Sequence, residues 1–127
     1  MTKENSKEKK TILLVDDENY IVEMIAVTLE IKGYNVLSTD KALDALELFK
    51  TNADVIDLVI SDQKMPRMLG TELAENILSI KNDVPVIIYT GFADEIDNSK
   101  AEELKLHIIK KPIIRNLLKE VSEILGT

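Results

Sequence analysis

The 127-residue sequence contains no cysteine, only one histidine and no long apolar run. The absence of cysteine excludes disulfides, zinc–thiolate sites and a cysteine nucleophile. A single histidine excludes a metal site built from several histidines. No apolar run approaches the about 20 residues that a membrane span needs, and no signal-peptide pattern follows the first methionine. We therefore expect a cytoplasmic protein.

The charges are unevenly distributed along the chain. The 16 Lys and Arg and the 23 Asp and Glu give a formal net charge of −7, yet residues 1–10 hold four Lys and two Glu. An acidic body argues against direct binding to nucleic acid, which normally requires a basic face. We expect residues 1–10 to form a flexible lysine-rich tail and residues 11–127 to form one globular domain, as 45% hydrophobic and 31% charged residues indicate.

Five short apolar runs lack the polar alternation of a half-exposed strand, which is typical of parallel strands buried on both faces. The runs are Thr11–Val15, Asn35–Ser38, Asp57–Ser61, Val84–Tyr89 and His107–Ile109.

Helical patterns, with apolar residues at a period of about 3.6, separate these runs. The predicted helices are Glu18–Lys32, Asp40–Lys50, Thr71–Lys81, Asp94–Lys105 and Ile113–Leu125. The fourth has the weakest pattern, because it is acidic and has few apolar positions. Alternating strands and helices of this length predict an α/β protein, a flavodoxin-like (βα)5 doubly wound fold. Its five-stranded parallel sheet would have the order 2-1-3-4-5, with helices on both faces.

Polar residues follow four of the predicted strands. Asp16 and Asp17 follow the first, Asp62 the third, Thr90 the fourth and Lys110–Pro112 the fifth. Ligand sites in open α/β sheets form outside the carboxyl ends of the strands, and the first and third strands are neighbours in the predicted order. The three carboxylates should therefore meet, which requires a positive group among them. Oxygen ligands without histidine or cysteine favour Mg²⁺.

A carboxylate beside Mg²⁺, a lysine and a hydroxyl is also the arrangement that aspartyl-phosphate chemistry needs. Each residue has a simpler interpretation: Asp16 or Asp17 could cap a helix, and Thr90 could do the same. The coincidence of all of them at the ends of strands favours a site. His107 is interpreted as a strand-packing or edge residue.

Four segments, in this order and spacing, resemble the receiver domain of bacterial two-component response regulators from about Thr11 to Leu125. They are ILLVDDE at Ile12–Glu18, LVISDQKMPRMLGTEL at Leu58–Leu73, VIIYTG at Val86–Gly91 and KKP at Lys110–Pro112. The most specific part is the pattern D-x-x-M-P-x-M-x-G after the third strand.

The resemblance implies a metal site and a phosphoacceptor. Asp62 would accept a phosphoryl group from a phosphohistidine of a sensor histidine kinase or histidine phosphotransfer protein, or from a small donor such as acetyl phosphate. Asp17 would bind Mg²⁺ directly together with Asp62, and Asp16 would act largely through water. The backbone carbonyl of Lys64 would complete the protein ligands.

It also implies how the signal leaves the site. Thr90 would bind a phosphoryl oxygen and move inward, while Lys111 would pair with Asp62 and then with the phosphoryl group. The Lys111–Pro112 peptide is a candidate for the cis form. The output would be a surface change around the fourth helix, fifth strand and fifth helix, read by a downstream protein. The chain would thus be a signalling module and not an enzyme. It would be a monomer or a phosphorylation-dependent dimer.

Two positions depart from the family pattern, Ile108 and Leu69, and Leu69 lies in a loop where the family frequently has an acidic residue. Ile108 occupies the position where Tyr or Phe commonly reports the switch, so the output would run through Thr90 and the following loop. Lys64 and Phe92 occupy positions at which the family tunes the lifetime of the phosphoryl group.

Other functions were weighed against the receiver. A Mg²⁺-dependent phosphohydrolase usually has an acid–base Asp two residues after its nucleophile, where this chain has Lys64. A nucleotide-binding protein would need a glycine-rich loop after the first strand. A degenerate receiver, acting only as a phosphorylation-independent docking module, is the remaining alternative. We expect a stand-alone regulator or a receiver cut from a longer protein.

Overall fold

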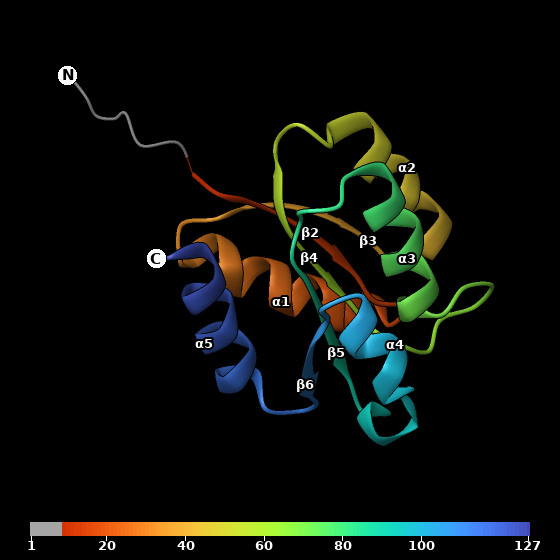
Figure 1. Cartoon of the computed structure of the whole chain (residues 1–127). Coiled ribbons are helices and arrows are strands. Elements are labelled where there is room, and N and C mark those ends of the chain that lie inside the picture. The colour runs from red at the N-terminus through yellow and green to blue at the C-terminus, as the bar shows by residue number, and fades with distance from the viewer. Residues whose placement is uncertain (1–8) are drawn as a thin grey trace.

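Five parallel strands form the central sheet of the computed structural model, which describes residues 9–127. The strands are β2 (Thr11–Val15), β3 (Asn35–Thr39), β4 (Ile56–Ser61), β5 (Val86–Thr90) and β6 (His107–Lys110). Their order in the sheet is β3-β2-β4-β5-β6 (Figure 1). Because β2 is the first of the five along the chain, this is the predicted order 2-1-3-4-5. Most of the predicted tail, residues 1–8, lies outside the described residues.

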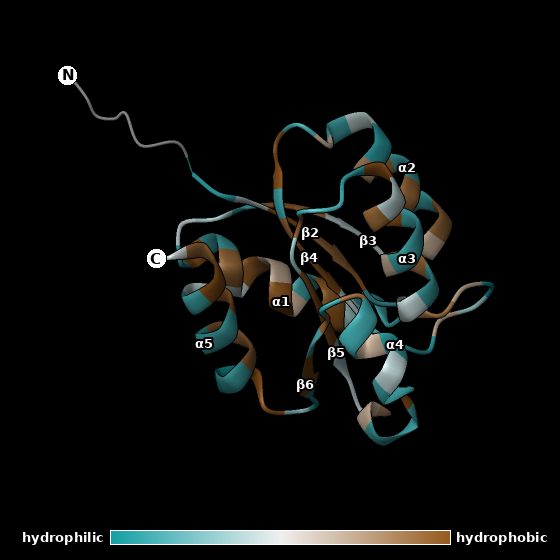
Figure 2. Cartoon of the chain, in the orientation of Figure 1, coloured by the Kyte–Doolittle hydropathy of each residue, from teal (hydrophilic) through white to brown (hydrophobic). Residues whose placement is uncertain are grey.

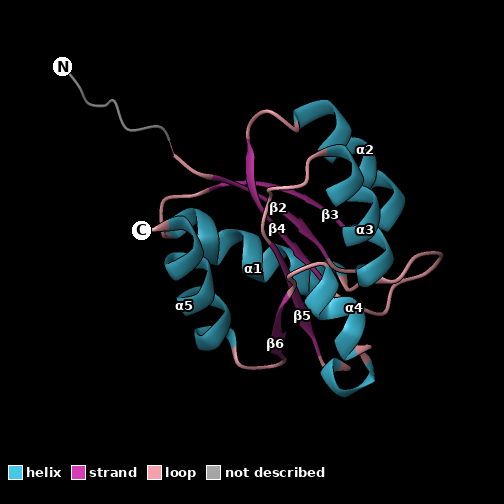
Figure 3. Ribbon diagram, viewed as in Figure 1, coloured by secondary structure: helices cyan, strands magenta, loops and turns pink. Residues whose placement is uncertain are grey.

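Helices cover both faces of the sheet (Figure 3). They are α1 (Asn19–Ile31), α2 (Ala42–Asn52), α3 (Gly70–Ile80), α4 (Asn98–Glu103) and α5 (Ile114–Leu125), with a 3₁₀ turn η1 (Ala93–Glu95) before α4. One hydrophobic core lies between the sheet and α1 and α5, and the other between the sheet and α2, α3 and α4. The flavodoxin-like fold predicted from the sequence is confirmed.

The three central strands, β2, β4 and β5, have almost no solvent-facing side because helices bury both of their faces, whereas the edge strands β3 and β6 are partly exposed. In β2, Ile12 and Leu14 belong to the core under α1 and α5, whereas Leu13 and Val15 belong to the core under α2 and α3. Figure 2 shows the result, with hydrophobic strands at the centre and hydrophilic outward faces of the helices. This double burial explains the continuous apolar runs in the sequence.

Among residues 9–127, no helix combines the length and hydropathy that crossing a membrane would require.

The predicted helix over Asp94–Lys105 is interrupted. Ile96 is buried and extended, with φ −80° and ψ 133°, so it separates η1 from α4. Asp97 then caps α4, because its Oδ1 accepts a hydrogen bond from the Ser99 N–H at 2.8 Å. The burial of one isoleucine thus divides the segment that the sequence pattern supported least.

Candidate functional site

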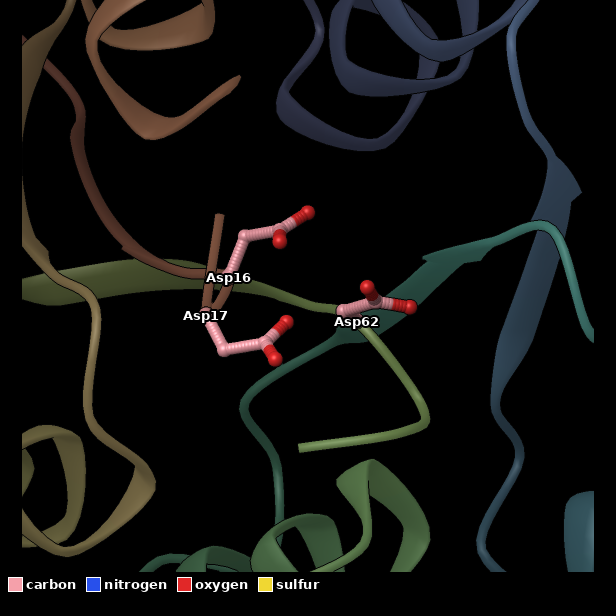
Figure 4. A group of neighbouring side chains, drawn as sticks. All are labelled: Asp16, Asp17 and Asp62. Carbon is pink, nitrogen blue, oxygen red and sulfur yellow. The ribbon is translucent and has the colours of Figure 1, made fainter. Parts of the chain in front are cut away.

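Three carboxylates gather at the carboxyl ends of β2 and β4. One oxygen from each of Asp16, Asp17 and Asp62 lies within 4.8 Å of the other two (Figure 4). Asp16 and Asp62 are buried, whereas Asp17 is exposed. The two strands are paired with Val15 opposite Ser61, so the residues that follow them emerge side by side. The predicted convergence of the three aspartates is confirmed.

Lys111 supplies the positive charge of this cluster. Its Nζ donates a hydrogen bond to Asp62 Oδ2 at 3.1 Å and a shorter one to Asp16 Oδ2 at 2.6 Å. The lysine reaches the cluster from the loop after β6, where its backbone N–H donates to the Thr90 carbonyl at 2.9 Å. The Lys111–Pro112 peptide is cis, as predicted. The pairing of Lys111 with Asp16 was not predicted, because no pattern in the sequence links two residues that are 95 positions apart.

Burial and neighbouring charges have opposite effects on the pKa values of Asp16 and Lys111. Burial raises the pKa of the Asp16 carboxyl, although hydrogen bonds from Lys111 and from the Glu18 N–H oppose the effect. Burial alone would lower the pKa of Lys111, but its hydrogen bonds and ion pairs with Asp16 and Asp62 prevail and raise it. Lys111 therefore stays charged, while the carboxylate cluster remains short of positive charge.

The donor set fits a hard divalent cation. The cluster offers carboxylate oxygens and no nitrogen or sulfur ligand, and three carboxylates exceed one ammonium by two charges. Mg²⁺ prefers such ligands and carries the matching charge. The cluster is consistent with Mg²⁺ binding.

Local hydrogen bonds orient two of the carboxylates. Asp16 Oδ1 accepts from the Glu18 N–H at 3.0 Å, and Asp62 Oδ1 accepts from the Gln63 N–H at 2.7 Å. The Asp62 N–H in turn donates to the Val15 carbonyl at 3.1 Å. Asp16 therefore does not cap α1, because the N-cap of this helix is Glu18 and no side chain caps it. Both aspartates instead accept hydrogen bonds in local turns, and the second oxygen of each carboxylate faces Lys111.

The loop between β4 and α3 is closed by Gln63 and Gly70. Gln63 is buried, and its side-chain amide accepts from the Thr71 N–H at 2.9 Å and donates to the Thr71 hydroxyl at 3.2 Å. The Gly70 N–H donates to the Gln63 carbonyl at 2.8 Å. A Cβ at position 70 would lie 2.1 Å from the Asp62 carbonyl oxygen, so only glycine permits this approach. The sequence analysis missed the role of Gln63.

Thr90 is fully buried at the end of β5, and its hydroxyl accepts from the Phe92 N–H at 3.1 Å. Ile108 packs into the core on the α2 and α3 side, in the position where the family often has an aromatic residue. Tyr89 packs on the opposite side of the sheet, under α1 and α5. The described residues therefore place no aromatic side chain in the usual switch position.

His107 lies on the edge strand of the sheet, which agrees with its interpretation as an edge residue. It lies at the start of β6 and is partly exposed, and its Nδ1 is 2.7 Å from Glu120 Oε2 on α5. This contact ties the last strand to the last helix, and it lies outside the carboxylate cluster.

Comparison with known proteins agrees with the family resemblance seen in the sequence. A family model described as "Response regulator receiver domain" matches residues 12–123. The chain is 33% identical over 126 residues to "Probable transcriptional regulator ycf27" of Cyanidium caldarium, covering 96% of this chain and 49% of that protein. It is 37% identical over 83 residues to "Two-component response regulator ARR10" of Arabidopsis thaliana, covering 65% of this chain and 15% of that protein.

Solved structures share the fold. A response regulator receiver domain protein of Clostridium thermocellum superimposes with a TM-score of 0.85 at 31% identity, covering 92% of this chain and 94% of that one. Response regulator TrrA of Thermotoga maritima, solved in complex with Mg²⁺ and BeF, has a TM-score of 0.81 at 29% identity. That match covers 91% of this chain and 98% of TrrA. The chain spans about half the length of the Cyanidium relative and much less of the Arabidopsis protein.

Proposed function

The chain belongs to the response regulator receiver family of two-component systems, and on this basis we propose that Asp62 accepts a phosphoryl group in a Mg²⁺-dependent reaction. The observation that carries the assignment is the Lys111 ammonium held between Asp16 and Asp62 inside a cluster of three carboxylates. A buried carboxylate that keeps a lysine and a divalent-cation site beside it is equipped to attack a phosphoryl group.

In the proposed reaction, an oxygen of Asp62 forms a bond to phosphorus as the phosphorus–nitrogen bond of the phosphohistidine breaks. Lys111 donates a hydrogen bond to the Asp62 carboxylate before the transfer and then pairs with the phosphoryl oxygens. The hydroxyl of Thr90 accepts from Phe92 and keeps its own proton free to donate to a phosphoryl oxygen. Bound Mg²⁺ would neutralise charge on the transferred group.

The metal would be held by Asp17 and Asp62 directly, by Asp16 largely through water and by the backbone carbonyl of Lys64. The first three are supported by their mutual distances and by the excess negative charge of the cluster. The proposed role of the Lys64 carbonyl as a ligand is supported by the family resemblance and by the position of Lys64 in the loop after Asp62.

The phosphohistidine donor would dock on α1. Four apolar residues with spacings of four, three and four form one exposed stripe along this helix: Tyr20 (66% exposed), Met24 (48%), Val27 (53%) and Ile31 (79%). The stripe begins a few residues after Asp16 and Asp17, at the edge of the site. A sensor histidine kinase or histidine phosphotransfer protein bound there would bring its phosphohistidine close to Asp62.

The chain would act as a signalling module that catalyses its own phosphorylation and slow dephosphorylation. Its output would be read by a protein that binds the α4, β6 and α5 surface. The cytoplasmic location and the oligomeric state remain predictions.

The test is the intact mass of the chain after incubation with acetyl phosphate and Mg²⁺. We expect one added phosphoryl group, absent in Asp62→Asn and in EDTA. If no adduct forms, binding of beryllofluoride would indicate that the phosphoryl group is added but rapidly hydrolysed. Absence of binding would indicate a docking module that is not phosphorylated. Failure of the wild-type chain in both assays would contradict the proposed function.

A further inference from the structure

Lys64, Phe92 and Glu95 form a cluster at the edge of the phosphoacceptor site, which we call the Lys64 cluster. The Lys64 Nζ lies 2.7 Å from Glu95 Oε1 and 4.4 Å from the centroid of the Phe92 ring. Lys64 belongs to the loop two residues after Asp62, whereas Phe92 and Glu95 belong to the segment that follows Thr90. The cluster therefore joins the two loops that carry the phosphoacceptor and the buried threonine.

The contacts of Lys64 are easily exchanged. Its side chain is 47% exposed and that of Glu95 is 55% exposed. Such an ion pair changes an equilibrium constant by no more than about fivefold, because water competes for both charges. The cation–π contact with Phe92, which is itself partly exposed, adds an attraction of similar size.

We propose that Lys64 pairs with Glu95 while Asp62 is unmodified and pairs with the phosphoryl group, as a second cation beside Lys111, once Asp62 is phosphorylated. The inference rests on the proposed function. A phosphoryl group carries a charge of roughly −1.5 to −2 and three acceptor oxygens, so it attracts an ammonium more strongly than one exposed carboxylate does. Lys64 then leaves Glu95, and the 3₁₀ turn η1 loses its tie to the β4–α3 loop.

This exchange would give the switch an output route without an aromatic residue at position 108. The Glu95 N–H donates to the Phe92 carbonyl at 3.0 Å, and the Phe92 N–H donates to the Thr90 hydroxyl at 3.1 Å. Movement of Thr90 therefore acts on this turn from one side while the departure of Lys64 acts on it from the other. The turn leads directly to Ile96 and α4, on the surface proposed for the output.

The test is a double-mutant cycle on the Kd of beryllofluoride in the presence of Mg²⁺. We expect Lys64→Met to weaken binding about threefold to tenfold, through the loss of one partly exposed charged contact. Glu95→Gln should tighten binding by up to about fivefold, because Lys64 no longer has to leave a carboxylate. In the Lys64→Met background, Glu95→Gln should change nothing.

Equal tightening by Glu95→Gln in both backgrounds, or none in either, would overturn the exchange. A wild-type chain that does not bind beryllofluoride would instead contradict the proposed function, so the two failures are distinguishable. Lys100→Met is the matched control, because Lys100 makes a similar exposed pair with Glu75 at 2.7 Å but joins α4 to α3. It should leave the Kd unchanged.

Amide chemical shifts give a second measurement. Saturation with beryllofluoride should shift the amides of Gln63 and Glu95 in the wild-type chain. In Lys64→Met the Gln63 shift should remain, because the ligand still binds, while the Glu95 shift should shrink. A Glu95 shift of unchanged size in this variant would rule out Lys64 as the connection.

Discussion

The Lys111 ammonium lies closer to Asp16 than to the proposed phosphoacceptor, at 2.6 Å from Asp16 Oδ2 and 3.1 Å from Asp62 Oδ2. Lys111 therefore neutralises part of the metal site as well as Asp62. A divalent cation held by the cluster would compete with this ammonium for Asp16, and Lys111 would then pair more with Asp62. Metal binding and lysine pairing would thus be coupled through one carboxylate.

The first prediction concerns the stability of the metal-free protein at different pH values. Burial raises the pKa of Asp16 above its value in the unfolded chain, so the folded state binds the proton more tightly. The ionised carboxylate therefore costs stability at neutral pH, and this cost disappears as the pH falls through the folded-state pKa. Urea unfolding in EDTA should show that Asp16→Asn gains stability relative to wild type at pH 7, and that the gain shrinks toward pH 4.

Excess Mg²⁺ provides the control for this prediction. It should stabilise the wild-type protein at pH 7 more than Asp16→Asn, because the cation supplies the missing charge. A difference between the two proteins that is the same at pH 7 and pH 4 would contradict the effect of burial.

The second prediction concerns Lys111. Replacement by methionine removes an ammonium that repels Mg²⁺ and two charged hydrogen bonds, so Mg²⁺ should bind more tightly while phosphorylation slows. The loss of one charged hydrogen bond to the phosphoryl group corresponds to about 1.5–3 kcal/mol, or a rate lower by at least about tenfold. Calorimetry with Mg²⁺ and intact-mass kinetics with acetyl phosphate measure the two effects.

Lys110→Met is the control, because the neighbouring lysine is exposed and should leave both values unchanged. If Lys111→Met weakens Mg²⁺ binding, Lys111 supports the metal site and does not compete with it.

The third prediction concerns Gly70. An alanine there would place its Cβ 2.1 Å from the Asp62 carbonyl oxygen, which would force the β4–α3 loop to move. We expect Gly70→Ala to lower the free energy of unfolding by about 1–3 kcal/mol, the usual cost of overpacking, and to slow phosphorylation of Asp62. Gly91→Ala is the control for stability, since no heavy atom lies within 4 Å of a Cβ at that position. Equal stability losses in the two variants would argue against the steric explanation.

The fourth prediction concerns donor docking on α1. Met24→Glu places a charge in the exposed apolar stripe and should slow phosphotransfer from a phosphohistidine protein by about tenfold or more, the effect of removing one good interface contact. The rate with acetyl phosphate should not change, because a small donor needs no docking surface. Leu43→Glu on α2 is the matched control, since Leu43 and Met24 are both 48% exposed. A slower rate with acetyl phosphate in Met24→Glu would place the defect in the site instead.

Local sequence patterns were sufficient for the strands and for most helices. The runs at Thr11–Val15 and Asp57–Ser61 are apolar because both faces of each strand are buried, and this burial leaves a continuous signal in the sequence. The exception is the segment 94–105, where the chain divides at Ile96. Ile96 is buried in the core on the side of α2 and α3. The local periodicity of apolar residues in the sequence does not predict this burial.

Strand order and the polarity at strand ends follow from short-range patterns and general packing rules, so the fold and the meeting of Asp16, Asp17 and Asp62 could be predicted from the residues alone. Which charges pair could not be predicted in this way. Lys111 contacts Asp16 across 95 positions of sequence, and Lys64 contacts Glu95 across two loops. Such pairs depend on side-chain positions set by loops from separate strands, and no local sequence pattern contains that information.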